Sequence, residues 1–138
     1  MANGVVVREP GQVDEPTRFW SLDEANGAIE WVGEVVERAQ ELLADYRAQT
    51  STSVRMVRQN GHGVVPADPL PIKACIDELA KEGIVLRDIE RGLIDFPARA
   101  ADGRWYWLCW LPGEDEIGWW HWPDAGFAGR TPITDRPA

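Results

Sequence analysis

The sequence predicts an α+β domain, in which an N-terminal helical hairpin packs on a small antiparallel β-meander of three or four strands. Two patterns predict this fold. Apolar residues recur at alternating steps of three and four in the first half of the chain, and at every second residue after Gly83. The 138 residues suit one domain. We place it at residues 17–138, after a disordered arm at residues 1–16 that is polar and has no period.

A capping box begins the first helix, with Ser21 at the N-cap and Glu24 three residues later. The apolar steps of three and four then continue for more than three heptads and predict a helix of about 28 residues. Residues 50–53 weaken this pattern, and whether the helix continues to about Arg58 is left open. The apolar stripe consists of Leu22, Ala25, Ile29, Val32, Val36, Ala39, Leu43 and Tyr46.

A second, shorter helix follows, for which Asp68 is the expected N-cap and Pro69 the first residue. It has about 14 residues and ends before Gly83. The first helix is the longer one, so part of its stripe is left for a homodimer through that helix or for the sheet to cover. Strands are expected at residues 84–87, 92–99, 104–111 and 116–122, and irregular chain at residues 123–138.

The register of the hairpins decides which side chains share a face of the sheet. Closing both hairpins over four residues places Asp95 and His121 on one face. Two strands separate these residues, which corresponds to about 10 Å or more. The same register turns Cys109 to the opposite face, where it could not share a metal with His121. The aromatic residues that would line a pocket beside His121 are Tyr106, Trp110 and Trp119.

Composition narrows the function classes. The formal net charge of −9 argues against nucleic acid as a partner. No apolar run is long enough to span a bilayer, and the N-terminus lacks the basic region of a signal peptide. With only two cysteines, the chain is expected to be cytoplasmic with both thiols reduced. Six of the eight tryptophans lie between Trp105 and Trp122, which favours a sheet core and leaves an aromatic binding surface as the alternative.

Several stretches of the chain resemble a bacterial and archaeal family called domain of unknown function 2203. The most specific are Asp-Phe-Pro-Ala at residues 95–98 and Gly-Phe-Ala-Gly-Arg at residues 126–130. The resemblance covers roughly residues 18–133, and it implies no catalytic residues because the role of the family is not established. Trp122 departs from the charged or polar residue expected there, which suggests a specialised ligand or partner in this member.

Two groups of residues are candidates for chemistry. Acids that suit a divalent metal or acid–base work accompany His121 in the sheet and at its ends, namely Asp95, Glu114 and Asp124. Their spacing matches no recognised metal signature, so a packed histidine bonded to a backbone carbonyl is the competing interpretation. Gly129 and Arg130 form a second candidate, because a glycine turn and a guanidinium can clamp a carboxylate or phosphate. The competing interpretation is a turn in which Arg130 pairs with an acid.

Two classes of function therefore remain open. The first, which we favour, is a non-enzymatic domain that binds a small molecule or a protein partner through a tryptophan-rich sheet face. The second is a small metal-dependent or acid–base enzyme centred on His121. An enzyme requires His121 in a partly wet pocket with a carboxylate within hydrogen-bond reach, whereas a binding domain requires exposed tryptophans or an uncovered helix stripe.

Overall fold

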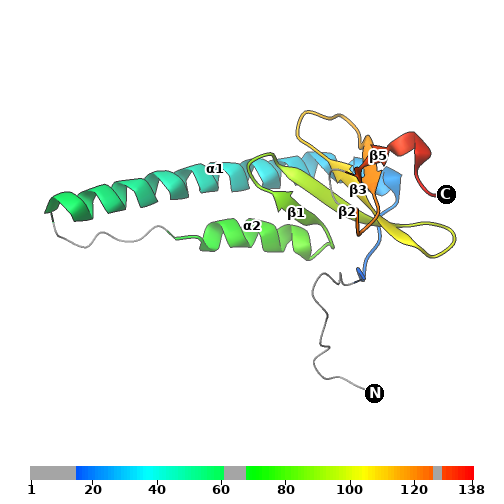
Figure 1. Ribbon diagram of the computed structural model, residues 1–138, viewed down its shortest axis with the longest axis horizontal. Helices are drawn as coiled ribbons and strands as arrows, with labels where there is room; N and C mark the ends of the chain where they lie inside the picture. Colours follow the sequence, from blue (N-terminus) through cyan, green and yellow to red (C-terminus); the bar gives the residue numbers. More distant parts are fainter. Residues whose placement is uncertain (1–14, 61–67, 126–128) are drawn as a thin grey trace, which may run out of the picture.

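A computed structural model describes residues 15–60, 68–125 and 129–138 of the chain. Helix α1 (Leu22–Asn60) is the long axis of the structure, and helix α2 (Leu70–Ala80) lies beside it in the antiparallel sense (Figure 1). The predicted helical hairpin is thereby confirmed. No helix within these ranges is long and apolar enough to cross a membrane. The arm predicted at residues 1–16 falls, except for its last two residues, outside the described part of the chain.

The predicted capping box begins α1. The Ser21 hydroxyl accepts the Glu24 backbone N–H at 3.0 Å, and a Glu24 carboxylate oxygen accepts the Ser21 N–H at 2.9 Å. The helix has 39 residues, and so is longer than the expected 28 or so. Thr50 is tolerated within it because its hydroxyl donates to the Tyr46 carbonyl at 2.8 Å, one turn earlier, which satisfies the side chain without breaking the helix.

The apolar stripe of α1 faces the sheet and α2. Its central members are fully buried, and Val35 joins them although it lies outside the heptad series: Ala25, Val32, Val35, Val36 and Ala39. The remaining members of the series are half-buried: Leu22, Ile29, Leu43 and Tyr46. Among residues 15–51, 68–125 and 129–138, the only large apolar side chain that is exposed is Leu70, at the start of α2. The stripe as far as Tyr46 is therefore at least partly covered within this single chain.

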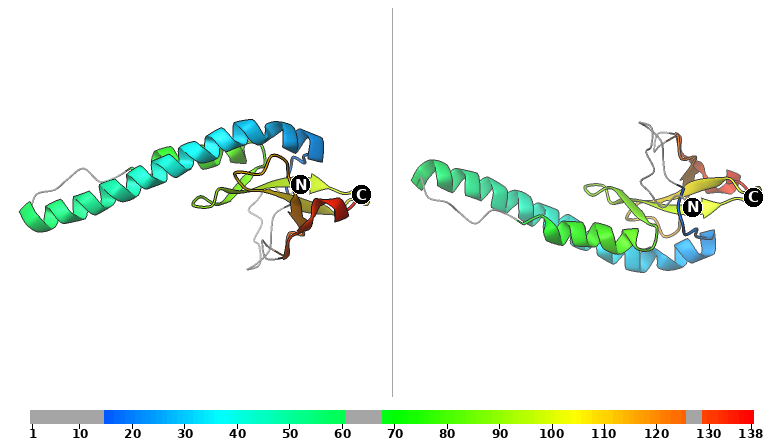
Figure 2. Two further views of the ribbon diagram at one scale, coloured as in Figure 1. Left: turned by 90° about the horizontal axis from the view of Figure 1, so that it is seen from above. Right: turned by 90° about the horizontal axis from the view of Figure 1, so that it is seen from below.

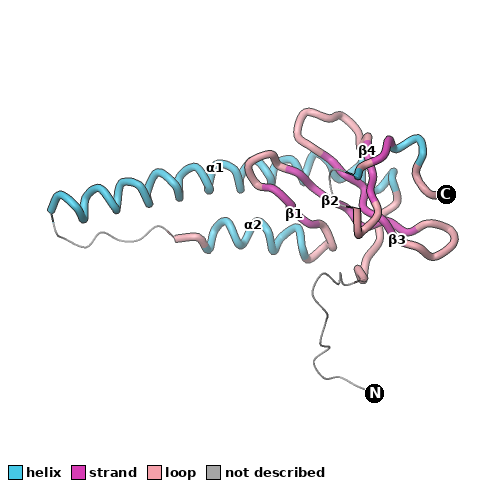
Figure 3. Tube along the Cα trace, viewed as in Figure 1, coloured by secondary structure: helices cyan, strands magenta, loops and turns pink. Residues whose placement is uncertain are grey.

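The sheet has five antiparallel strands in chain order, so the prediction of three or four strands was too low. The first four correspond to the predicted strands, and the fourth is shorter than expected: β1 (Val85–Asp88), β2 (Leu93–Arg99), β3 (Trp105–Trp110) and β4 (Trp119–His121). The fifth, β5 (Thr131–Pro132), pairs with β4 and leads into a 3₁₀ turn at Ile133–Asp135 (Figure 3). Both lie within residues 123–138, which were predicted to be irregular. A strand of two residues is too short to show the alternation of side chains from which strands are predicted.

The helices cover one face of the sheet (Figure 2). On the helix-side face, apolar residues of three strands pack against α1 to form the core: Ile94, Phe96, Ala98, Tyr106, Leu108, Trp110 and Trp120. We call the opposite side the outer face. It carries Asp95, Pro97, Trp105, Trp107, Cys109, Trp119 and His121.

The register differs by one residue from the predicted register in both hairpins. Arg99 pairs with Trp105 rather than Arg104, and Trp107 pairs with His121. Because side chains alternate along a strand, each shift of one residue reverses the faces of the neighbouring strand. The two shifts cancel between β2 and β4 but not at β3. Asp95 and His121 therefore share a face as predicted, whereas every residue of β3 lies on the face opposite to the predicted one.

Candidate functional site

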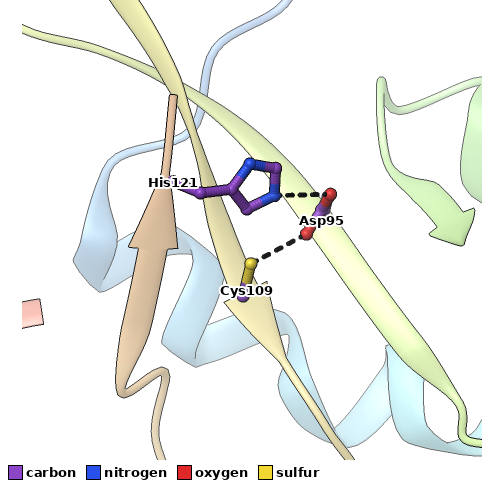
Figure 4. A group of neighbouring side chains, drawn as sticks. All are labelled: Asp95, Cys109 and His121. Atoms are coloured by element: carbon purple, nitrogen blue, oxygen red, sulfur yellow. Dashed lines mark hydrogen bonds and ion pairs between the residues drawn. The ribbon is translucent and has the colours of Figure 1, made fainter. Parts of the chain in front are cut away.

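Three polar side chains meet on the outer face of the sheet, each from a different strand: Asp95 from β2, Cys109 from β3 and His121 from β4 (Figure 4). A carboxylate oxygen, the thiol sulfur and a ring nitrogen all lie within 4.8 Å of one another. The residues are 1%, 2% and 4% exposed, respectively. Buried polar groups are costly unless they are partnered, so their hydrogen bonds must account for this position.

Asp95 is at the centre of these hydrogen bonds. Its Oδ1 accepts from the Cys109 thiol at 3.0 Å. Its Oδ2 is 3.1 Å from His121 Nε2 and accepts from Arg87 Nε at 2.9 Å. Burial raises the pKa of Asp95, but these three hydrogen bonds and the charge of the ring outweigh it, so the pKa lies below its ordinary value. The carboxylate is therefore ionised at neutral pH.

His121 has an acceptor on each side of its ring. Nδ1 is 2.9 Å from the backbone oxygen of Trp122, and Nε2 faces the Asp95 carboxylate. A neutral imidazole carries one proton and can satisfy only one of these acceptors. Burial lowers the pKa of His121, but the hydrogen bond and charge of Asp95, together with the Trp122 carbonyl, raise it to a value above the ordinary one. Without a metal, the arrangement thus favours an imidazolium–carboxylate pair.

The Cys109 sulfur carries its proton in the metal-free protein. Burial and the adjacent Asp95 carboxylate raise the pKa of this thiol far above its usual range. A thiol in this state is a poor nucleophile. Among the described residues, metal-type donors gather only at Asp95, Cys109 and His121.

Two predictions about this cluster were wrong. Cys109 lies on the same face as His121, because the true register reverses β3. Asp95 and His121 are in contact rather than about 10 Å apart. The predicted separation was that of the strand backbones, which holds for side chains standing perpendicular to the sheet. Here the two side chains lean toward each other over Cys109, whose small side chain on the intervening strand leaves room for them.

Two arginines, each lying over a tryptophan, accompany the cluster on the outer face. The Arg87 guanidinium carbon lies 4.8 Å from the Trp107 ring centre, and the Arg87 side chain is 41% exposed. The Arg130 guanidinium carbon lies 4.5 Å from the ring centre of Trp119, the residue paired with Cys109. Arg87 was missed in the sequence, where it is one of twelve arginines. Its position on β1, the neighbour of β2, could have suggested it as a partner of Asp95.

The structure does not bring the other predicted residues into this cluster. Glu114 lies in the β3–β4 connection, where its carboxylate accepts the Leu111 N–H at 2.8 Å. Asp124 and Gly129 are exposed. His121 itself is almost fully buried, and one ring nitrogen is bonded to backbone, so the arrangement does not provide the open, wet pocket that an acid–base enzyme requires at this histidine.

The three predicted pocket-lining residues are divided between the two faces of the sheet. Trp119 is half-buried on the outer face, whereas Tyr106 and Trp110 are buried on the helix-side face. Tyr106 also lines a cavity of about 410 Å³ between the start of α1 and the C-terminal segment, together with Arg99 and Arg136. All eight tryptophans fall within the described residues, and each is buried or half-buried. The sheet-core interpretation of these residues is the one that their burial supports.

Comparison with known proteins gives a family but no characterised counterpart. No curated protein and no solved structure matches the chain. The family described as "Uncharacterized conserved protein (DUF2203)" matches residues 18–133, a range that contains α1, α2, all five strands and the whole Asp95–Cys109–His121 cluster. Because the match covers most of the 138 residues, the chain belongs to the DUF2203 family.

Proposed function

We propose that this protein binds a divalent transition-metal ion, of which zinc is the best fit, through Asp95, Cys109 and His121. The observation that carries the proposal is the convergence of three different donor atoms within 4.8 Å, each on its own strand of a rigid sheet. A thiolate, an imidazole and a carboxylate together form a donor set of intermediate softness. Such a set suits Zn²⁺ and is unlike the all-oxygen sets of Mg²⁺ and Ca²⁺.

The surroundings of the donors resemble those of metal ligands in general. Metal-bound histidines usually donate their second ring N–H to a carbonyl or carboxylate, which directs the other nitrogen toward the metal. His121 has this arrangement, because its Nδ1 faces the Trp122 carbonyl and its Nε2 faces the cluster. The carboxylate of Asp95 is likewise held by a hydrogen bond, which Arg87 Nε donates to Oδ2 at 2.9 Å.

A metal ion requires a modest rearrangement of the cluster, in which the two hydrogen-bonded pairs move apart and the three donors, now within 4.8 Å of one another, draw together around the ion. Tetrahedral bonds of about 2.0 Å to nitrogen or oxygen and about 2.3 Å to sulfur place neighbouring ligand atoms about 3.3–3.5 Å apart. The observed separations are 3.1 Å for Nε2 to Oδ2 and 3.0 Å for sulfur to Oδ1, which are hydrogen-bond distances. Binding would therefore replace two protons, one on the ring and one on the thiol, with the metal ion. Protons would be released on binding.

The test is metal analysis of the full-length, tag-free protein by mass spectrometry, followed by titration of the stripped protein with Zn²⁺ and Co²⁺. The chain supplies matched controls, because it has two histidines and two cysteines. We expect close to one metal per chain in the wild type, in His62→Ala and in Cys75→Ala. We expect loss of that metal in His121→Ala and Cys109→Ala, and a sulfur-to-cobalt charge-transfer band only where Cys109 is present.

The opposite result has a definite meaning. Folded wild-type protein that takes up no metal, or takes up equal amounts in the controls and in the cluster variants, would overturn the proposal. Asp95, Cys109 and His121 would then be a buried, hydrogen-bonded ion pair within the sheet. Circular dichroism of each variant establishes that loss of metal is not loss of the fold.

A further inference from the structure

A metal at Asp95, Cys109 and His121 would have an incomplete set of ligands. Zinc prefers four donors, and the described part of the chain supplies three at this position. A site with three protein donors leaves one position for a group that comes from outside the cluster. The residues around this position show which group would suit it. This inference rests on the proposed metal site and deepens it.

Arg87 has hydrogen-bond donors that its contact with Asp95 does not use. A guanidinium has five N–H donors, and the bond to Asp95 engages the one on Nε. Its planar fork is suited to the paired oxygens of a carboxylate or phosphate. The side chain is 41% exposed, whereas the three donors are almost fully buried. Arg87 therefore lies between the cluster and solvent, on the side from which a ligand would enter.

Trp107 supplies a second donor on the same face. Its indole N–H is buried and has no acceptor among the described residues. A buried donor without an acceptor is unusual and costs stability. Trp107 pairs with His121 across the β3–β4 ladder, and its ring lies beneath the Arg87 guanidinium. An oxygen atom bound close to Arg87 and His121 would lie in the neighbourhood of this N–H.

Arg130 brings a second guanidinium to the outer face of the sheet. It lies over Trp119, which is paired with Cys109. A divalent metal with one thiolate and one carboxylate is neutral, so the Arg87 guanidinium that bonds this carboxylate adds positive charge beside a neutral centre. This charge favours an anion over water at the fourth position.

We propose that the fourth metal ligand is a small oxyanion, of the carboxylate or phosphate class, which binds the metal through one oxygen and contacts Arg87 and Arg130 through the others. Both classes share negative charge and paired oxygen acceptors, which arginine recognises by bidentate hydrogen bonds. Carboxylate and phosphate are separated by experiment. The geometry assigns Arg87 and Arg130 as binding residues for this ligand and not as metal ligands.

The experiment uses the full-length protein loaded with Co²⁺, whose visible spectrum reports the ligands and the coordination number of the metal. Acetate, oxalate and inorganic phosphate are titrated separately, with chloride at equal ionic strength as the control. We expect a saturable change in the cobalt spectrum with oxalate or phosphate and none with chloride. Whichever of the two binds more tightly identifies the class. Arg130→Gln should weaken the apparent affinity about tenfold or more while cobalt remains bound.

Arg104→Gln is the matched control, because Arg104 also lies over a tryptophan but is exposed and paired with Asp102, away from the cluster. It should bind the anion as the wild type does. Cobalt bound with its sulfur band but unresponsive to every anion would overturn this inference and leave the metal site intact. An equal change in the cobalt spectrum of the wild type and of Arg130→Gln would also overturn this inference and leave the metal site intact. Failure to bind cobalt at all would overturn both proposals together.

Discussion

His121 Nε2 lies 3.1 Å from Asp95 Oδ2, although β3 runs between the strands that carry these two residues. Both side chains are less than 5% exposed. On the intervening strand Cys109 pairs with Asp95, and Trp107 pairs with His121. The small Cys109 side chain leaves room for the contact and donates to the other oxygen of Asp95. The pair and the cysteine are thus interdependent, and the first four predictions concern this cluster.

Asp95→Asn should destabilise the metal-free protein strongly. The amide would leave Arg87 and the His121 imidazolium without their anionic partner, and removal of one member of a buried ion pair costs about 3–5 kcal/mol. Urea unfolding of the stripped protein measures this change. Asp102→Asn removes an aspartate whose pairing with Arg104 is solvent-exposed, so it should have little effect. Equal stability of both variants would contradict the structural account of the cluster.

The stability of the metal-free protein should pass through a maximum in mildly acidic solution. The pKa of His121 is raised in the folded state, so its contribution is complete below the ordinary value of 6.5 and is lost as pH rises through the folded pKa. The pKa of Asp95 is lowered, so its contribution is present above the ordinary value of 3.8 and is lost as pH falls through the folded pKa. The free energy of unfolding should therefore be greatest between these two ordinary values.

Zinc should reverse the slope of this dependence near neutral pH. The metal requires a thiolate and an unprotonated ring nitrogen, so metal-linked stability increases as pH rises. Urea unfolding between pH 5 and pH 8, with and without Zn²⁺, measures both slopes, taking about pH 6.5 as the midpoint for an unperturbed histidine. His121→Ala should remove the difference between them. A falling slope in the presence of saturating Zn²⁺ would argue that the imidazolium survives and that no metal binds there.

Cys109 can be tested for its role as a spacer separately from its role as a ligand. Cys109→Ser keeps a small hydroxyl that can donate to Asp95, so the Asp95–His121 contact should remain. Cys109→Leu places extra methyl groups between the two side chains, and overpacking of this kind costs about 1–3 kcal/mol. The proton resonance and titration of the His121 ring, followed by NMR, should be native-like in the serine variant and altered in the leucine variant. Similar spectra for both would exclude the spacer role.

A fifth prediction concerns the loop between β1 and β2, where Gly92 has a φ of +76°. A Cβ atom there would lie 2.6 Å from Pro112 Cγ and 2.9 Å from Val36 Cγ1. Gly92→Ala should therefore cost more than about 1 kcal/mol, from backbone strain and from these close contacts. Gly113 has a φ of +100° but open space around it, so Gly113→Ala should cost less. Thermal unfolding of both variants tests this order.

The sequence predicted the elements of this fold better than it predicted the site. The heptad stripe and the capping box at Ser21 and Glu24 located α1, because helix periodicity and capping are local properties. Period-two alternation located β1 to β4 for the same reason. β5 could not be found in this way, since a two-residue strand has no period and forms only because β4 offers it a free edge.

The cluster depended on register, which local patterns do not determine in a sheet with apolar residues on both faces. Along β3, Trp105, Trp107 and Cys109 alternate with Tyr106, Leu108 and Trp110. Both sets are largely apolar, so either set could face the helices. A shift of one residue in the register of β3 therefore exchanges one largely apolar set of side chains for another, and the sequence pattern does not reveal the error. Asp95 and His121 were placed on the correct face only because two errors of one residue cancelled. Their direct contact depends on how the side chains lean, which no strand pattern encodes.

The chain-order topology of the sheet has a consequence for how the cluster forms during folding. Cys109 follows Asp95 by 14 residues, and His121 follows Asp95 by 26, so all three donors are brought together by hairpins between consecutive strands. Closing loops of this length is entropically inexpensive and fast compared with long-range pairing. The three donors can therefore come together as the consecutive hairpins of the sheet form, before α1 packs on it. A metal ion present at that stage would stabilise the hairpins as they form and so speed refolding, in addition to stabilising the folded sheet.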